Sequence, residues 1–421
     1  MNFILSALYS IFNKFPKLIF CSIIMLYVFE PLQDIKAIES NDLNARKTID
    51  LYYRKLSDMF ADPDLDSNEV DEQVLTLVDG LFDFEKLAPQ ILQRKWAKLN
   101  KYEQDSFTEA LQVSLKNKIV SQLKKYNNKD SSLLSFESKE TKKNFAKLNY
   151  SISGNEITIF MIKYPDGLWK VTNVKTGKES LMREYYSFCK KHLSKYSIAS
   201  LIAEIQNADY VVLENFEAGE IDKLPRGWTW RKRDRKKNKP YKIREENGNK
   251  YLAAEDNGES VILGKDLKWD LRKYPYISFR WRTTKLPEGG DERYGKTVDS
   301  AAGIYIVYKK RFGKIPSSIK YVWSTTLPVG SYMRRSGIGR PWMVVAESGT
   351  DHLGEWRTYV FNAYDAYKKT FGGRPPNNPV GIGILSDANS THSQAYADYD
   401  DIRALKQADA DSGVKTFLKA E

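Results

Sequence analysis

The chain has 421 residues and a formal net charge of +12; 42% of its residues are hydrophobic and 29% are charged. This length and composition exclude a single small scaffold and a disordered or collagen-like chain. Most of the nine Trp lie beyond residue 209, which indicates a change of architecture near that position. We therefore expect two folded domains.

The first 40 residues have the pattern of an export signal. Lys14 and Lys17 precede an apolar run at 18–29, which has the length of a signal-peptide core and is shorter than the ~20 residues of a membrane-spanning helix. We predict a cleaved signal peptide within 1–40, with a retained N-terminal anchor as the alternative. Either outcome predicts a periplasmic protein.

From residue 43 to about 125, hydrophobic side chains recur at helical spacing. The clearest stripe contains Phe107, Leu111 and Leu115, and most of the nearby lysines lie off it. This pattern is typical of half-buried helices. Asp83 precedes a further helical segment as a suitable N-cap.

The hydrophobic period then changes from helical to alternating, which indicates strands at 149–153, 156–163 and 168–174. Two short helices follow, near 181–192 and 198–205. We expect residues 43–206 to form an α+β domain, with helices first and a small antiparallel sheet after them.

Three blocks of this region carry a family resemblance. They lie at 81–111 (beginning LFDFEKLAPQ), 166–174 (DGLWKVTNV) and 179–205 (beginning ESLMREYYSF). Their order and content resemble the periplasmic phospholipid-carrier family of the lipid-asymmetry systems, also called MlaC-like or toluene-tolerance proteins. The sequence departs from the family at Gln93, where a Gly is usual, and at Cys189, which follows Phe188 where polar residues ordinarily continue the helix.

The resemblance implies that this domain binds phospholipid and exchanges it with a membrane ABC-type lipid transporter. Each buried CH₂ contributes about 0.8 kcal/mol, so two acyl chains represent a gross gain on the order of 20 kcal/mol, and release needs a partner. A carrier needs an apolar lining and no catalytic residue. Ordinary core packing is the alternative role for each lining candidate. The candidates are Leu87, Ile91, Leu115, Ile119, Ile159, Met161, Trp169 and Phe188.

Residues 210–406 contain about nine short segments with strand character, followed by a tail at 407–421. The clearest alternation places Ile277, Phe279 and Trp281 on one face of a strand, and Arg280 and Arg282 on the other. Many short strands separated by turns predict an antiparallel all-β sandwich, and we expect a jelly roll.

This second half has its own resemblance, over about 211–405, to the family called domain of unknown function 3047. The resemblance implies no established activity. The blocks that carry it include 275–293 (PYISFRWRTTKLPEGGDER), 354–372 (GEWRTYVFNAYDAYKKTFG) and 381–402 (GIGILSDANSTHSQAYADYDDI).

The start and end of this half are also distantly similar to carbohydrate-binding jelly rolls, whose first and last strands often share a structural calcium. That similarity implies Glu217, Asp398 and Asp400 as oxygen ligands of a calcium ion, which prefers such ligands. Solvated carboxylates at strand ends are the alternative.

The segment 231–239 is strongly basic, and a second basic stretch at 309–340 includes Lys320 and Arg335. Because no nucleic-acid-binding motif accompanies them, anionic lipid head groups or acidic envelope glycans are the better candidate partners. A solvated loop is the alternative. The surface-binding candidates are Arg231, Lys232, Arg233, Arg235, Lys236 and Lys237.

The sequence gives little support for an enzyme. Two carboxylates could serve glycoside chemistry if they lay about 5–10 Å apart. The candidates are Asp387, Asp398, Asp400 and Asp401, which cluster in the sequence, and Asp299, which precedes a strand. No nucleophile elbow, HExxH motif, phosphate-binding loop or Cys/His metal spacing is present. We therefore expect a non-enzymatic lipid-binding protein. An envelope carbohydrate-binding protein and a glycan-active enzyme are the alternatives.

Overall fold

The computed structural model describes residues 45–61, 67–126, 134–152, 155–311, 315–408 and 416–417. The expected signal segment at 1–40 and most of the expected tail lie outside the described residues. The chain divides into two compact units, the first largely before His192 and the second largely from His192 onward. Among the described residues, no helix is both long enough and apolar enough to cross a membrane.

The helices of the first unit precede most of its sheet, as the hydrophobic periodicity predicted. Asp83 caps α4, and its carboxylate accepts a 3.0 Å hydrogen bond from the backbone N–H of Lys86. The helix ends at Gln93, whose φ of 50° is in the range that favours glycine. The helices are α2 (Ala45–Ala61), α3 (Ser67–Leu81), α4 (Phe84–Leu92), the 3₁₀ helix η2 (Gln93–Lys98), α5 (Lys101–Tyr126) and α6 (Leu181–Leu193).

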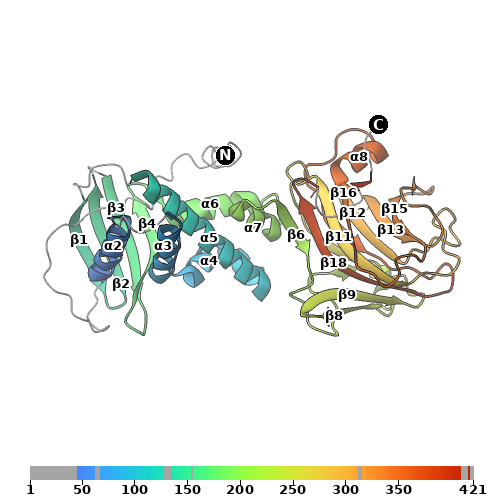
Figure 1. Ribbon diagram of the computed structural model, residues 1–421, viewed down its shortest axis with the longest axis horizontal. Helices are drawn as coiled ribbons and strands as arrows, with labels where there is room; N and C mark the ends of the chain where they lie inside the picture. Colours follow the sequence, from blue (N-terminus) through green and yellow to red (C-terminus); the bar gives the residue numbers. More distant parts are fainter. Residues whose placement is uncertain are drawn as a thin grey trace. The chain divides into compact units, whose positions relative to one another are not determined.

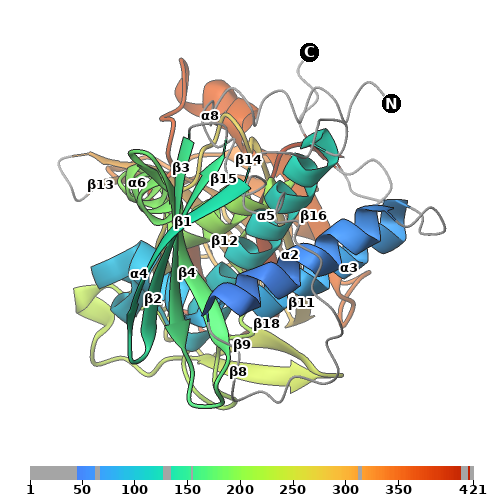
Figure 2. The same ribbon diagram turned by 90° about the vertical axis from the view of Figure 1, so that its left-hand side faces the viewer.

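A five-stranded antiparallel sheet completes the first unit, with its strands in chain order. Helices α2 and α3 lie beside it, contacting β2 and β4 (Figure 2). The predicted α+β class is confirmed, but strand β1 was not predicted, because its sequence LSFESKETK is largely polar. The strands are β1 (Leu134–Lys142), β2 (Phe145–Ile152), β3 (Asn155–Lys163), β4 (Trp169–Thr176) and β5 (Glu179–Ser180).

The second unit contains two sheets, named here after a central strand of each. The β11 sheet has the order β19-β16-β11-β18-β9-β8, with β6 also paired to β18, and the β12 sheet has the order β14-β15-β13-β12-β17-β10-β7. Figure 1 shows the two sheets as separate layers. The strands are β6 (Tyr210–Glu214), β7 (Thr229–Trp230), β8 (Tyr241–Glu246), β9 (Asn249–Asp256), β10 (Leu263–Asp266), β11 (Tyr276–Lys285), β12 (Ala302–Arg311), β13 (Ile315–Ser324), β14 (Tyr332–Met333), β15 (Trp342–Ser348), β16 (Arg357–Asn362), β17 (Gly381–Ile384), β18 (Ala395–Leu405) and β19 (Thr416–Phe417).

The two sheets enclose an aromatic-rich core. Phe279 and Trp281 of β11 are fully buried, as the alternation predicted, and the Phe279 ring lies 5.9 Å from the ring of Tyr321 on β13. Tyr321 in turn stacks on Phe361 of β16 at 4.2 Å. Because the inner faces of both sheets share one core cluster, the second unit is a β-sandwich.

The sandwich is not antiparallel throughout, which corrects the sequence prediction. Strands β13 and β15 run parallel, as do β16 and β19. Between β13 and β15 the chain forms the edge strand β14, antiparallel to β15, so β15 enters the sheet in the same direction as β13. The jelly-roll connectivity stays a prediction.

Helix α7 (Ile198–Gln206) packs within the second unit. Ser197 caps it, and both the backbone N–H and the hydroxyl of Ser197 donate to the carbonyl of Lys268 at 2.9 Å. Glu204 pairs with Lys273. The second unit therefore begins ahead of the boundary at 206–210 that the sequence suggested. Its other helices are the 3₁₀ helix η3 (Lys232–Asp234) and α8 (Ala363–Phe371).

Candidate functional site

One face of the sheet in the first unit is apolar across three strands. Ile159 and Met161 alternate on β3 and therefore point to the same side. Ile159 lies opposite Leu148 and Val174, and all three are at most 1% exposed. Met161 likewise lies between Ala146 of β2 and Val171 of β4 and is fully buried.

Helices α4 and α5 contribute buried side chains to the same unit. Leu87 and Ile91 are one turn apart on α4, which places them on one face of the helix. Leu115 on α5 is 1% exposed. The start of α4 is fixed to the sheet because the backbone N–H of Asp83 donates to the carbonyl of Val171 at 3.3 Å.

The other three lipid-lining candidates differ in their surroundings. Trp169 opens β4 and is 6% exposed, and its indole N–H is buried without a hydrogen-bond partner among the described residues. Phe188 is half-buried on α6, and the side chain of Ile119 lies outside the described residues. Thus Leu87, Ile91, Leu115, Ile159, Met161 and Trp169 are buried, as either a lipid lining or a core requires.

Glu184 is an acidic group on the half-buried side of α6 that the sequence interpretation missed. Burial raises the pKa of this carboxyl to about 7, although the charge of Lys118 opposes the shift. One of its oxygens is buried without a hydrogen-bond partner among the described residues. The sequence could have indicated this partial burial. Glu184 lies three residues after Leu181 and four before Phe188, and that spacing places it on the apolar stripe of the helix.

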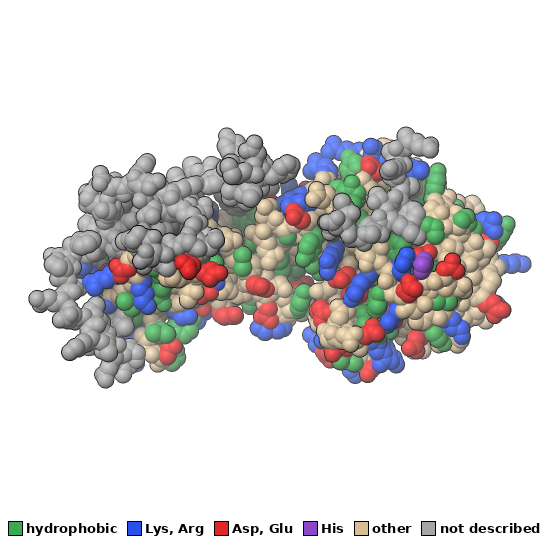
Figure 3. Space-filling view, viewed as in Figure 1, with side chains coloured by type: hydrophobic (Ala, Val, Ile, Leu, Met, Phe, Trp, Pro, Cys, Tyr) green, Lys and Arg blue, Asp and Glu red, His purple; other side chains and the backbone are tan. Residues whose placement is uncertain are grey.

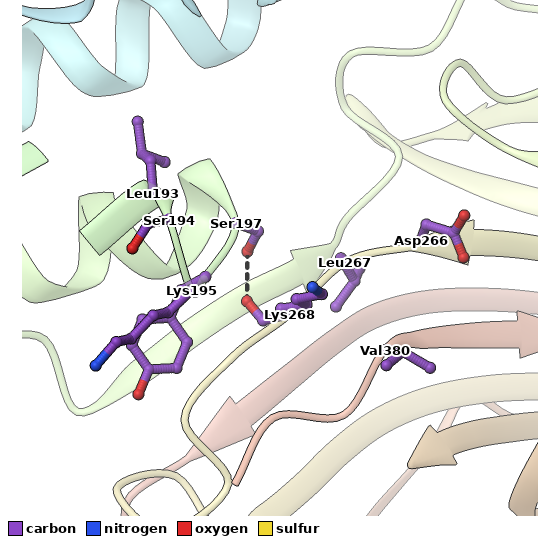
Figure 4. Close-up of a pocket in the computed structure, with 9 residues that line it drawn as sticks. Leu193, Ser194, Lys195, Ser197, Asp266, Leu267, Lys268 and Val380 are labelled. Atoms are coloured by element: carbon purple, nitrogen blue, oxygen red, sulfur yellow. Dashed lines mark hydrogen bonds between the residues drawn. The ribbon is translucent and has the colours of Figure 1, made fainter. Parts of the chain in front are cut away.

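An open pocket of about 430 Å³ lies in the second unit (Figure 4). It is lined by the segment before α7, by the segment that follows β10 and by Val380. The Ser197 hydroxyl bonds to the Lys268 carbonyl within it. None of the predicted site residues lines this pocket, and its lining is mixed, with Lys195, Asp266 and Lys268 beside apolar side chains.

The three proposed calcium ligands have separate partners. Asp398 accepts a 2.8 Å hydrogen bond from Arg282, and Asp400 accepts one of 3.1 Å from Arg280. Glu217 accepts from the backbone N–H of Lys250 at 3.1 Å. Within the described parts of the chain, no group of three or more His, Cys, Asp or Glu is placed to hold a metal ion. The calcium site is thus untested, and the arginine partners of Asp398 and Asp400 argue against it.

The basic segment after β7 is exposed, apart from one buried carboxylate. Asp234 is fully buried and pairs with Arg231 at 2.8 Å and with Arg233 at 3.6 Å. The ammonium of Lys239 lies 4.9 Å from the ring of Trp230, which is 37% exposed. The remaining basic candidates, Lys232, Arg235, Lys236 and Lys237, are all exposed.

Lys320, in the second basic stretch, is not a surface residue. It is 3% exposed, and the charges of Glu292, Asp299 and Asp387 act on it. The structure therefore brings Asp299 and Asp387, two of the five carboxylates named from the sequence, near Lys320. Glu292 also belongs to this cluster, which the sequence did not indicate. Elsewhere, Lys/Arg and Asp/Glu are interspersed on the face of the second unit in view in Figure 3.

The comparisons assign a family to each half of the chain. The model of the MlaC protein family matches residues 46–207, and the model of the protein of unknown function DUF3047 matches residues 226–403. No curated protein matches the chain.

Solved structures also match, among them the following two. A phospholipid-binding protein from Ralstonia solanacearum, solved in complex with a phospholipid, is 18% identical; the match covers 39% of this chain and 96% of that one, with a TM-score of 0.34. The glycoside hydrolase domain of Endo-D from Streptococcus pneumoniae R6 is 8% identical; that match covers 43% of this chain and 21% of that one, with a TM-score of 0.21. The two family models match separate regions of the chain, an MlaC region followed by a DUF3047 region.

Proposed function

We propose that the first unit binds a phospholipid and carries it between envelope membranes, receiving it from or delivering it to a membrane ABC-type transporter. The match of the MlaC family model over residues 46–207 is the observation that carries this proposal. The buried apolar residues on β3, α4 and α5 support it, because acyl chains need such a lining and no catalytic group.

The proposal places the protein in the periplasm. The apolar run at 18–29 after Lys14 and Lys17 supports export, and a cleaved signal would release the mature chain. The proposed lipid contacts are the eight candidates derived from the sequence, of which Ile159, Met161 and Leu115 are at most 1% exposed.

A pair of substitutions on α5 tests where lipid is held. Leu115→Trp adds volume inside the first unit, whereas Val113→Trp adds it at a position that is 41% exposed on the same helix. Each protein is incubated with phosphatidylglycerol vesicles and separated from them, and its bound lipid phosphorus is measured. We expect Leu115→Trp to lose most of its lipid and Val113→Trp to keep it.

Equal lipid content in both variants would contradict a site at Leu115. If Leu115→Trp loses its helical circular dichroism, Ile159→Phe is the replacement, because it alters the lining by a smaller volume. If the parent and a folded Ile159→Phe variant bind the same amount of lipid, the lipid does not lie at Ile159.

We further propose that the exposed basic segment at 231–237 contacts anionic membrane surfaces during transfer. Each Lys or Arg near such a surface contributes about 1 kcal/mol, and salt screens the attraction. A variant with Lys232, Arg235, Lys236 and Lys237 changed to Gln should sediment less with anionic vesicles at low salt than the parent does. Equal sedimentation of the two proteins would refute this contact.

A further inference from the structure

Four residues form one row across the β12 sheet. Tyr305 lies opposite Gly383 on one side and opposite Lys320 on the other, and Gly383 lies opposite Gly264. Their chain neighbours, such as Ile304 and Ile319, face the core between the two sheets. Because successive residues of a strand point to opposite faces, the row lies on the outer face of the sandwich.

The glycine end of this row is open. A Cβ added at Gly264 would meet nothing closer than two backbone oxygens, at 3.9 and 4.0 Å. Gly264 therefore leaves bare backbone where a ligand could approach the sheet closely. Gly383 is buried, and a Cβ added there would stand 3.1 Å from the Leu263 carbonyl oxygen and 3.4 Å from Tyr305 Cβ.

At the other end of the row, the buried Lys320 ammonium has more N–H donors than acceptors among the described residues. Its hydrogen-bond partner among the described residues is the Ser300 hydroxyl at 3.4 Å, and the ammonium lies 5.7 Å from the centroid of the Tyr305 ring. Ser300 itself donates to Glu292 at 2.9 Å. Since an ammonium carries three N–H donors, Lys320 can still donate to a ligand.

Arg335 and Arg340, from the segment before β15, add positive charge near Tyr305. Burial, together with the charge of Arg340, lowers the pKa of Arg335. Within the described residues, no carboxylate forms a salt bridge within 4.0 Å with Arg335 or Arg340, and the charge of Asp387 acts on Arg335. Arg335, Arg340 and Arg231 all act electrostatically on the Tyr305 hydroxyl. Unpaired guanidinia at one place favour an anion, which they bind with charge-assisted hydrogen bonds.

The same place also offers an acceptor. Asp387 is 8% exposed, and one of its oxygens is buried without a hydrogen-bond partner in the described part of the chain. Its charge acts on both Lys320 and Tyr305. A carboxylate repels a purely anionic ligand but accepts readily from a hydroxyl group.

We propose that Tyr305, Lys320, Arg335, Arg340 and Asp387, here called the Tyr305 site, bind an acidic saccharide. Its carboxylate or phosphate group contacts the guanidinia and Lys320, and a sugar hydroxyl donates to Asp387. A membrane surface fits less well, because Lys320 and Asp387 are recessed and Asp387 would repel anionic head groups. This site belongs to the second unit and does not depend on lipid binding by the first.

Titration calorimetry with the full chain tests the proposal. The probes are a uronic acid tetrasaccharide, a hexose 6-phosphate, a neutral glucose tetrasaccharide and inorganic phosphate. We expect one of the two acidic sugars to bind, and the acidic sugar that binds identifies the anionic group. Failure of both to bind would overturn the proposal. Equal affinity for the neutral sugar would also overturn it, as would equal affinity for inorganic phosphate, which would indicate an anion site only.

Substitutions then locate the binding. Arg335→Gln and Arg340→Gln should each weaken it at least about tenfold, as expected for a lost charge-assisted contact. Arg244→Gln, on β8 of the other sheet, should change it less than about twofold, because that arginine pairs with Asp222. Gly264→Val fills the open floor without removing charge and should abolish binding while keeping the melting temperature. Unchanged affinity in a folded Gly264→Val protein would place the saccharide elsewhere.

Discussion

Lys320 lies directly across the backbone of Gly303. A Cβ added at Gly303 would overlap Lys320 Cε, and it would stand 3.2 Å from the ammonium and 3.0 Å from the Leu385 carbonyl oxygen. The glycine is therefore what allows a long charged side chain to lie against the sheet and remain 3% exposed.

Gly303→Ala should destabilise the second unit by about 1–3 kcal/mol, because the Leu385 carbonyl cannot move as a side chain would. Gly264→Ala is the matched control, since an added methyl there has room, and we expect a change below about 0.5 kcal/mol. Urea unfolding of the two variants measures the difference. Similar stability of both variants would mean that Lys320 does not depend on Gly303.

Gln93→Gly should stabilise the first unit by about 1 kcal/mol. Gln93 has φ 50° and ψ −127°, a backbone conformation that is strained for any residue with a Cβ atom but not for glycine. Asn207→Gly is the control: Asn207 also has positive φ, at 53°, but in the left-handed region that asparagine tolerates. Thermal unfolding should show a larger rise in melting temperature for Gln93→Gly. A fall in that variant would show that the turn does not strain Gln93.

Glu184 should make the stability of the first unit depend on pH. Its folded pKa of about 7 lies above the ordinary value of 4.5. Between those values the folded chain holds a proton that the unfolded chain has lost, so the free energy of unfolding falls as pH rises through this window. Glu184→Gln removes the effect and should gain stability relative to the parent between pH 5 and pH 8.

The gain should be on the order of 1 kcal/mol, since Glu184 is only half-buried and solvent screens part of the interaction. Glu109→Gln, at an exposed position of α5, is the control, and its difference from the parent should not vary with pH. An equal gain for Glu184→Gln at both pH values would indicate a packing effect rather than a titration.

Calcium should leave the melting temperature unchanged, because Asp398 and Asp400 are already paired with Arg282 and Arg280. The measurement is differential scanning calorimetry with millimolar calcium and with a chelator. A rise of several degrees with calcium would instead support the ligand set of Glu217, Asp398 and Asp400.

The sequence predicted those features that depend on a strong local pattern. Ile277, Phe279 and Trp281 alternate with polar residues, and the buried face of β11 follows from that alternation alone. Strand β1 has no such pattern, and its pairing with β2 depends on the tertiary structure. The parallel pairing of β13 with β15 also required the structure, because local sequence does not define strand order.

For the candidate sites too, the sequence indicated local properties but not the contacts that depend on the tertiary structure. The apolar stripes of α4 and β3 indicated which residues are buried, but not whether they contact lipid. Lys320 was taken for part of a basic surface because composition does not show which way a side chain points. Glu292 and Asp299, whose charges act on Lys320, precede β12 in the chain and come near Lys320 only through the fold.

Native mass spectrometry of the full chain, purified from cells without detergent and followed by lipid extraction, tests the central claim most directly. We expect one phospholipid per chain, released when the first unit unfolds. A folded protein that carries no phospholipid from cells and acquires none from phosphatidylglycerol vesicles would contradict it.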